Sequence, residues 1–277
     1  MADYELIMNL VTVVIPIYKE NLSDNEALSF EQCCKVLGRY EISLVFPSGL
    51  CLKEYEYYLD KYQVVFNKFS FNPVYFAGIE GYNKLLLSVD FYLSFVNYQY
   101  ILIYQLDAFV FRDELEYWCS KGYDYIGAPW FKRIWRFKYS KSLRAIGNGG
   151  FSLRKVQSCI NVLKYNGKFK PLRYFFTFHN AVFLKLKKMP LKNWRSLKIE
   201  NSVDFFVSIN RKTEDQFWSL DTQNAYVDFK VAPIGEGIKF AFECYPSYLM
   251  KLNNGNLPFG CHAWERYELE FWKKYIG

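Results

Sequence analysis

The segment from Tyr100 to Phe111 constrains the fold of this 277-residue chain more than any other. Its apolar run from Ile101 to Ile103 is typical of a strand buried on both faces of a sheet. Asp107 follows where this strand is expected to end, next to the crevice in which open α/β sheets bind ligands. A buried carboxylate needs a cation or hydrogen-bond donors there. The alternative is that Asp107 only caps a turn or the helix that begins near Asp113.

Strands and helices alternate along the first half of the chain. Strands are expected at Val11 to Tyr18, Glu41 to Phe46, Gln63 to Phe66 and again after Tyr100, and helices at Ser23 to Leu37, Leu52 to Tyr62 and Gly78 to Gln99. This alternation favours an α/β fold with a mixed, mainly parallel sheet flanked by helices. We expect one domain over residues 1–277.

Composition excludes several classes of protein. No stretch approaches the roughly 20 apolar residues that span a bilayer, and the acidic N-terminus lacks the basic region of a signal peptide, so a cytoplasmic location is expected. Seven cysteines, including the adjacent Cys33 and Cys34, fit reduced thiols better than a disulfide framework. A structural zinc site is not expected with only two histidines. The net charge of +7 indicates an anionic partner without identifying it.

Two segments are basic. Residues 131–144 mix lysine and arginine with aromatic residues, and their charges form no single helical stripe, so we expect a loop or lid. Such a segment suits a nucleic-acid surface, a membrane interface or a lid over a diphosphate, and the plainer alternative is a solvated loop. The second segment, at about 166–200, is expected to be a mainly helical insertion, with His179 as a packed or capping residue.

Three later motifs carry residues of chemical interest. Gly149 and Gly150 lie in a glycine-rich turn that permits close approach of a ligand but is not a P-loop. Glu214 and Asp215 form a pair of carboxylates at an expected helix start. His262 follows Gly260, which we expect to give the backbone room to approach a ligand.

In this order the motifs resemble those of GT-A glycosyltransferases. The shared features are a Val-Val-Ile-Pro-x-Tyr strand, an x-x-Asp after the central strand, Gly-Gly-Phe-Ser-Leu-Arg, Glu-Asp before a helix and a late histidine. Gln-Leu-Asp, Gly-Asn-Gly-Gly-Phe-Ser-Leu-Arg and Phe-Gly-Cys-His-Ala-Trp further resemble a bacterial domain family of unknown function that is related to GT-A transferases. The resemblance covers about residues 10–265 and implies a Rossmann-like GT-A fold.

The resemblance also implies roles for individual residues. Asp107 and His262 would ligate a divalent metal, Mn²⁺ or Mg²⁺, that bridges the donor diphosphate. Asp215 would be the general base of an inverting transfer, with Glu214 as the alternative base or as an orienting group. The expected donor-binding residues are Pro16, Tyr18, Lys84, Gln105, Asp107, Gly149 and Gly150. For Lys84, the favoured alternative is an exposed, solvated lysine.

The expected function is a metal-dependent, inverting glycosyltransferase that moves a sugar from a nucleotide-diphosphate sugar to a hydroxyl of a glycan or lipid-linked acceptor. Peripheral contact with the inner face of the cell membrane would follow from the basic segments. One alternative is a sugar nucleotidyltransferase, although Pro16 to Glu20 has no glycine where that class places a glycine-rich loop. The other is a nucleic-acid-binding module, which leaves Asp107, Asp215 and His262 unexplained, so no nucleic-acid partner is expected.

Overall fold

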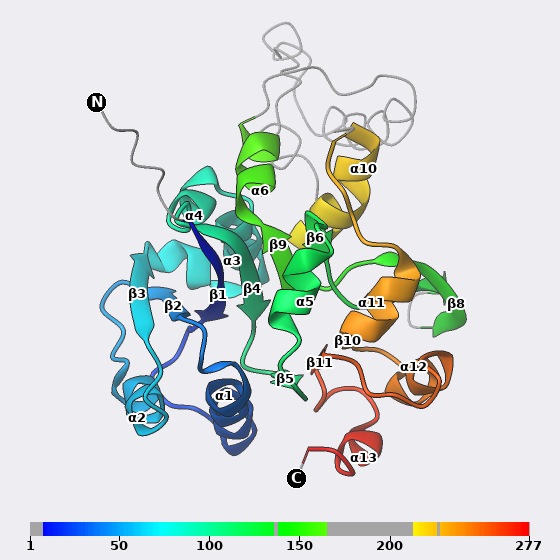
Figure 1. Ribbon diagram of the computed structural model, residues 1–277, viewed down its shortest axis with the longest axis horizontal. Coiled ribbons are helices and arrows are strands. Elements are labelled where there is room, and N and C mark those ends of the chain that lie inside the picture. Colours follow the sequence, from blue (N-terminus) through cyan, green and yellow to red (C-terminus); the bar gives the residue numbers. More distant parts are fainter. Residues whose placement is uncertain (1–7, 136–137, 165–212, 226–227, 277) are drawn as a thin grey trace, which may run out of the picture.

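The computed structural model describes residues 8–135, 138–164, 213–225 and 228–276, and a six-stranded sheet forms its centre (Figure 1). In spatial order the strands are β3 (Phe66–Phe71), β2 (Ile42–Pro47), β1 (Asn9–Pro16), β4 (Tyr98–Tyr104), β9 (Phe151–Lys155) and β6 (Tyr125–Ile126). The first four are parallel, and β9 runs antiparallel to both of its neighbours. This confirms the mixed, mainly parallel sheet, although β3 begins three residues later than the expected start at Gln63.

The central strand β4 contributes to two hydrophobic cores, one on each face of the sheet. Leu102 and Tyr104 belong to one core, and Ile101 and Ile103 belong to the other. All four side chains are fully buried. Because burying one such side chain contributes about 1.5–3 kcal/mol, the apolar run holds β4 at the middle of the fold.

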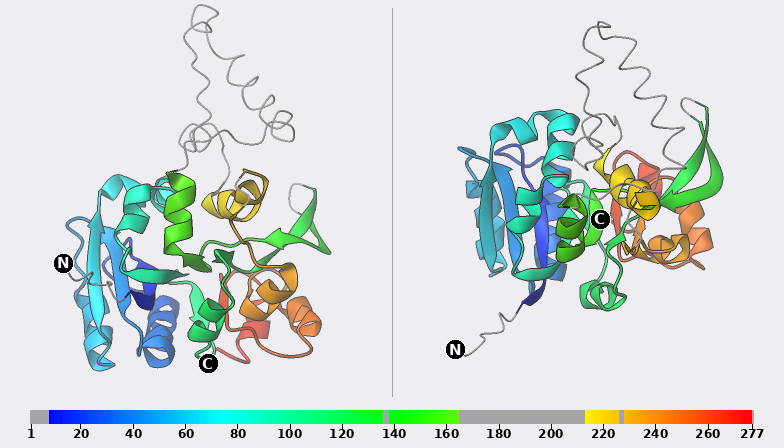
Figure 2. Two further views of the ribbon diagram at one scale, coloured as in Figure 1. Left: turned by 45° about the horizontal axis from the view of Figure 1, so that its top comes forward. Right: turned by 90° about the horizontal axis from the view of Figure 1, so that it is seen from above.

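Helices cover both faces of the sheet (Figures 1 and 2). The helices on one face are α1 (Asp24–Leu37), α2 (Lys53–Lys61) and α5 (Leu115–Ser120), and those on the other are α3 (Gly78–Leu86), α4 (Val89–Leu93) and α6 (Val156–Leu163). Ser23 and Glu26 form the expected capping box of α1. The single helix expected from Gly78 to Gln99 is wrong, because Ser88 caps a separate helix α4 and β4 already begins at Tyr98.

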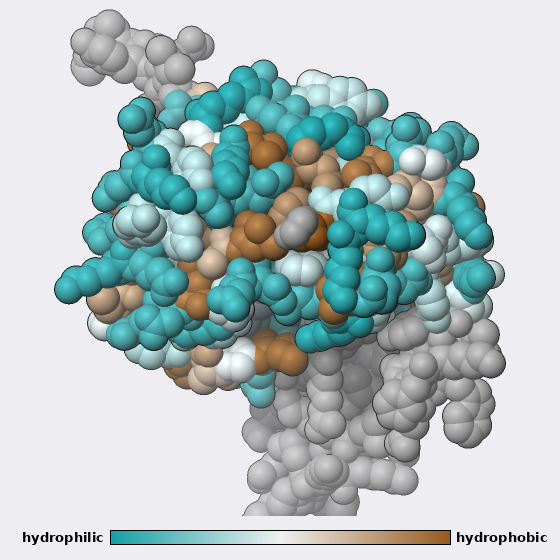
Figure 3. Space-filling view, turned by 90° about the horizontal axis from the view of Figure 1, so that it is seen from below, coloured by the Kyte–Doolittle hydropathy of each residue, from teal (hydrophilic) through white to brown (hydrophobic). Residues whose placement is uncertain are grey.

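The C-terminal part packs beside the main sheet as a smaller layer (Figures 1 and 2). Its elements are a three-stranded sheet of β10 (Ala241–Phe242), β11 (Gly260–His262) and β5 (Ala108–Val110), and the helices α11 (Ile234–Phe240), α12 (Pro246–Leu252) and α13 (Leu269–Trp272). Seen from below, the surface is mostly hydrophilic, with hydrophobic side chains gathered near the middle of the view (Figure 3). No helix in the described ranges is long and apolar enough to cross a bilayer.

The basic segment 131–144 forms part of a β-hairpin, not the expected irregular loop. Strands β7 (Pro129–Trp135) and β8 (Lys138–Ile146) pair antiparallel and project from the body (Figure 2). A helical wheel was the wrong test for this segment, because side chains of a strand alternate between two faces. Phe131 is buried against Tyr245, whereas Lys132 is exposed. The expected helical insertion at about 166–200, with His179, lies outside the described residues.

Candidate functional site

The end of β4 and the end of β11 meet at one cluster of polar side chains. Strand β11 pairs antiparallel with β5, and this register places His262 opposite Ala108. His262 Nε2 therefore lies 3.1 Å from Asp107 Oδ1 and 3.0 Å from Gln105 Oε1. The sequence analysis expected Asp107 and His262 to lie together, and the fold brings them into direct contact.

Burial and charge determine the protonation of this cluster. Burial would lower the pKa of His262, but the carboxylates of Asp107 and Glu243 together outweigh burial and raise this pKa to about 10. Burial would likewise raise the pKa of Asp107, and the neighbouring imidazolium instead lowers it. His262 Nδ1 has no hydrogen-bond partner in the part of the chain that the structure describes, and Glu243 Oε1 lies 3.6 Å away. The cluster is thus a charged pair with one unsatisfied ring nitrogen.

The donor atoms of this cluster fit a divalent cation. Ligands at right angles on an octahedral cation with bonds of about 2.1 Å lie about 3 Å apart, which matches both contacts of His262 Nε2. A carboxylate oxygen, an imidazole nitrogen and an amide oxygen are ligands that Mn²⁺ accepts. No group of three or more His, Cys, Asp or Glu side chains is placed to hold a metal within the described residues.

The glycine-rich turn forms the back of this cluster. A Cβ at Gly150 would lie 2.1 Å from His262 Nε2 and 2.6 Å from Gln105 Oε1, so no side chain fits there. Asn148, in the left-handed region at φ +63, accepts a hydrogen bond from Gly150 N through Oδ1. A glycine is required at Gly260 for a different reason from the one expected, because a Cβ at this position would lie 2.4 Å from the ring of Phe151. Packing, not ligand approach, requires that glycine.

Arg154 and Glu214 form a buried ion pair next to the turn. Arg154 Nη1 lies 2.9 Å from Glu214 Oε2, and the two side chains are 0% and 3% exposed. Arg154 also donates to Gly149 O at 3.3 Å, and a Cβ at Gly149 would lie 1.8 Å from Glu214 Oε1. Burial raises the pKa of Glu214, and the charge of Arg154 opposes this shift. Glu214 thus fixes the turn and is not free to meet a substrate.

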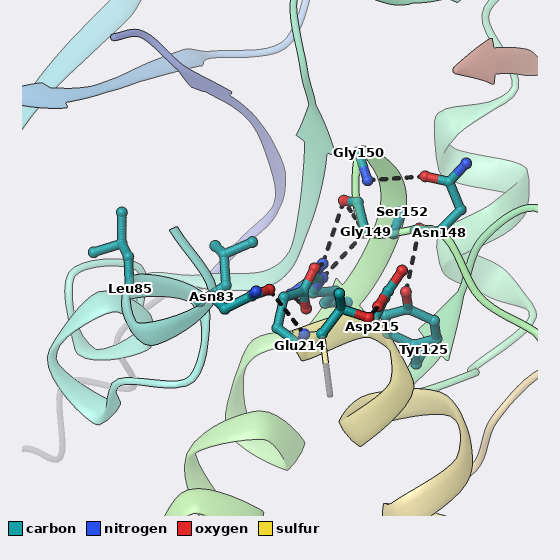
Figure 4. Close-up of polar contacts among 12 residues, drawn as sticks. Asn83, Leu85, Tyr125, Asn148, Gly149, Gly150, Ser152, Glu214 and Asp215 are labelled. Carbon is teal, nitrogen blue, oxygen red and sulfur yellow. Dashed lines mark hydrogen bonds and ion pairs between the residues drawn. The ribbon is translucent and has the colours of Figure 1, made fainter. Parts of the chain in front are cut away.

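Asp215 has a different environment from its neighbour. Thr213 Oγ1 donates to Asp215 Oδ1, and Gln216 N donates to the same oxygen at 2.8 Å. Burial raises the pKa of Asp215, and these two hydrogen bonds offset part of the increase. The side chain is only half-buried and points toward Tyr125 (Figure 4). A carboxylate with a raised pKa and partial access suits proton transfer.

A cleft of about 540 Å³ opens beside Gln105 and Asp107. Its other walls include Pro16 and Tyr18 at the end of β1 and Tyr82 of α3. A smaller hollow of about 320 Å³ lies on the other side of Asp107 and is lined by Glu265 and Arg266, among others. Most of the cleft is aromatic or apolar, which suits a flat ring, whereas the smaller hollow is polar.

The structure separates the expected site residues into three groups. Gln105, Asp107, Gly150 and His262 converge directly, while Pro16 and Tyr18 line the adjoining cleft. Gly149, Glu214 and Asp215 lie on the far side of the glycine turn. Lys84 is not brought to the cleft, because it pairs with Glu80 at 2.9 Å and its side chain is 62% exposed. Two residues along a helix turn a side chain by about 200°, so Lys84 and Tyr82 face different ways.

Sequence reasoning missed three residues of the site: Tyr82, Asn83 and Arg154. Tyr82 lies one helical turn after Gly78, and this spacing placed both on one face of α3. Arg154 stands at the end of the Gly-Gly-Phe-Ser-Leu-Arg motif, where an arginine in an otherwise apolar strand requires a buried partner. Nothing in the sequence linked Asn83 to Glu214, which lies 131 residues later.

Comparisons with known proteins identify the family and the fold of the chain. Residues 66–262 match the family model described as "Protein of unknown function (DUF5672)". No curated protein matches the sequence significantly. Among solved structures, the galactosyltransferase LgtC in complex with donor and acceptor sugar analogs matches with a TM-score of 0.50 and 12% identity, covering 96% of this chain and 95% of that chain.

Two further structures are similar. An active-site mutant of LgtC has a TM-score of 0.51 at 12% identity, over 96% of this chain and 95% of that chain. The apo glycosyltransferase GlyE of Streptococcus pneumoniae TIGR4 has a TM-score of 0.45 at 11% identity, over 97% of this chain, and the chain spans 60% of GlyE. The matches to LgtC confirm the expected fold class, a GT-A-like α/β fold.

Proposed function

The chain belongs to the family of unknown function DUF5672, and from this premise we propose that it is a metal-dependent glycosyltransferase that uses a nucleotide-diphosphate sugar. The observation that carries the proposal is the contact of Asp107, Gln105 and His262 at the edge of a cleft, backed by a glycine that admits no side chain. Its fold is that of glycosyltransferases, although the likeness at 12% identity supports only the fold.

The donor occupies the cleft and the polar cluster together. The base and ribose lie against Pro16 and Tyr18, the diphosphate reaches Asp107, and the sugar reaches the peptide of Gly149 and Gly150. The support for this arrangement is the cleft itself, in which apolar and aromatic walls end at Asp107. Gln105 is near the ribose side of the cleft and within reach of His262.

Asp107 and His262 hold the divalent cation, Mn²⁺ or Mg²⁺. When bound, the cation neutralises charge that develops on the leaving diphosphate. To ligate, His262 must lose the proton that it shares with Asp107, and its ring is then oriented by Glu243 on the Nδ1 side. Gly150 lets the backbone pass close to Nε2, because a Cβ at this position would lie 2.1 Å from that nitrogen.

Asp215 is the general base, and Glu214 positions it. Burial raises the pKa of both carboxylates, but Glu214 is paired with buried Arg154, whereas the side chain of Asp215 is only half-buried. A base that deprotonates the attacking hydroxyl in a single displacement implies inversion at the anomeric carbon. Each transfer then moves one proton from the acceptor to Asp215 while the bond from sugar to phosphate breaks.

The acceptor is a hydroxyl of a glycan or of a lipid-linked intermediate. Exposed Lys132, Lys141 and Arg144 on the β7–β8 hairpin would attract an anionic membrane surface. Binding to vesicles that contain anionic lipid, and its loss when these three residues are replaced by glutamine, would test the membrane part of the proposal.

A thermal-shift screen of nucleotide sugars with and without Mn²⁺ tests the proposed function. A ligand that binds only the native state raises the unfolding temperature according to its affinity. We expect at least one nucleotide sugar to raise it in Mn²⁺ and to do so much less in a chelator. If no nucleotide sugar raises it in either condition, the proposed function is wrong.

A further inference from the structure

Two neighbouring residues of α3 face two different parts of the site. Tyr82 lines the cleft together with Gly78 and Ile79. The next residue, Asn83, accepts a hydrogen bond from the backbone N–H of Glu214 through Oδ1 at 2.9 Å (Figure 4). One short helix therefore touches both the cleft and the acid pair.

The cleft face of α3 has features that a ligand would satisfy. Ile79 is 76% exposed, so a ligand in the cleft would cover apolar surface on this helix. The Tyr82 hydroxyl is shielded from solvent and lies near the side chain of Gln105, which lines the same cleft. A ligand in the cleft would therefore cover α3 at both Ile79 and Tyr82 and hold this helix in one position.

The hydrogen bond from Glu214 N to Asn83 takes the place of a helix cap. The helix α9 (Glu214–Gln216) starts after Thr213, and Thr213 makes no side-chain cap hydrogen bond in the described structure. Its hydroxyl instead donates to Asp215 Oδ1. The first N–H groups of a helix need acceptors. Asn83 supplies one from another helix, so the start of α9 is tied to α3.

We propose that Asn83 is a positioning residue, which couples occupancy of the cleft to the placement of Glu214 and Asp215. This inference rests on the proposed function for the presence of a nucleotide in the cleft. When the cleft is filled, α3 is held in one position, and its hydrogen bond to Glu214 N holds the start of α9. Asp215, the next residue, then has a fixed place beside the glycine turn.

Hydrogen–deuterium exchange of the full chain, with and without UDP and Mn²⁺, tests this coupling. A nucleoside diphosphate lacks the transferable sugar of the donor, so it leaves the acid pair without direct contact. GDP, CDP, ADP and dTDP serve as further probes. We expect the wild-type protein to show slower exchange in α3 and also in residues 214–217, by roughly 2- to 10-fold, the range for one hydrogen bond.

Asn83→Ala and a matched control separate coupling from general stability. Asn256 donates from Nδ2 to Asn253 O at 3.1 Å in the turn after α12, so Asn256→Ala removes a local side-chain-to-backbone bond away from α3. We expect Asn83→Ala to bind UDP within about twofold of wild type but to lose the protection of residues 214–217, and Asn256→Ala to keep it.

The outcomes distinguish the inference from the proposed function. Protection of α3 without protection of residues 214–217 in the wild-type protein would overturn the coupling alone, as would full protection in Asn83→Ala. If none of the five diphosphates binds the wild-type protein in Mn²⁺, both the proposed function and the inference are wrong.

Discussion

Two acidic sites on either side of the glycine turn differ in burial and in partners. Glu214 is 3% exposed and paired with a fully buried arginine. Asp107 is 39% exposed and paired with a histidine at the edge of a cleft. The first pair is shielded from solvent and contacts the backbone of the glycine turn, whereas the second borders a cleft.

The comparison also separates the two adjacent acids. Glu214 and Asp215 are neighbours in sequence, yet only Asp215 retains partial access. A carboxylate that is fully paired in a closed site contributes to structure, and its removal leaves an unpaired buried charge. A half-buried carboxylate with a raised pKa is available for proton transfer.

The largest effect is expected for Asp215→Asn. If Asp215 is only structural, the contrast drawn between Glu214 and Asp215 does not hold. The variant should bind donor nearly as the wild type does but lose transfer by about 10²–10⁴-fold, because a general base is removed. Steady-state kinetics with the donor found by thermal shift measures this loss. Glu214→Gln is the matched control. Loss of transfer only in the control would assign the base to Glu214.

Arg154→Leu should have the next largest effect, on stability. It leaves Glu214 as an unpaired buried charge, which costs about 3–5 kcal/mol of unfolding free energy. Urea unfolding monitored by circular dichroism measures the change, and Arg39→Leu, which removes an exposed partner of Asp113, is the control. A stability of Arg154→Leu equal to that of the control would contradict the structural role of the buried pair.

The raised pKa of His262 predicts how stability and metal binding at the Asp107–His262 cluster depend on pH. Because the pKa of His262 is raised, its protonated ring stabilises the metal-free folded state. This contribution to the free energy of unfolding is complete below pH 6.5 and is lost as the pH rises through about 10. Mn²⁺ must displace the same proton, so its affinity should rise by roughly tenfold per pH unit within that range. Calorimetry in buffers of different ionisation enthalpy should detect about one released proton. A pH-independent affinity would exclude His262 as a ligand.

Lys84→Ala should have the smallest effect. Lys84 is exposed and pairs only with Glu80 among the described residues, and surface ion pairs contribute little. Unfolding temperature and donor affinity should stay within experimental error of the wild-type values. A clear loss of donor affinity would return Lys84 to the donor site.

Local sequence patterns were sufficient to predict much of the fold. The apolar run of β4 and the capping box of α1 are short-range signals, and both elements formed where expected. The meeting of Asp107 and His262 came from the family resemblance, because the pairing of β5 with β11 joins segments about 150 residues apart. No local rule predicts such a register.

The residues that were missed act through long-range contacts or through a different periodicity. Asn83 accepts a hydrogen bond from the backbone N–H of Glu214, and a backbone contact does not require any particular residue type near Glu214. The β7–β8 hairpin was missed because its basic residues were tested against a helical period. Lys84 was assigned to the donor from its position on a helix, without evidence for the direction of its side chain.

Isothermal titration calorimetry of Asp107→Asn tests the central claim most directly. It measures the Mn²⁺-dependent binding of UDP or another nucleoside diphosphate to this variant. The variant should remain folded at about 25 °C but unfold at a lower temperature than the wild type, because protonated His262 loses its carboxylate partner, and it should lose at least about tenfold in affinity in Mn²⁺. Glu265→Gln, in the same polar hollow but without a contact to His262 among the described residues, should bind as the wild type does. Equal affinity and equal Mn²⁺ dependence in Asp107→Asn and wild type would contradict the account.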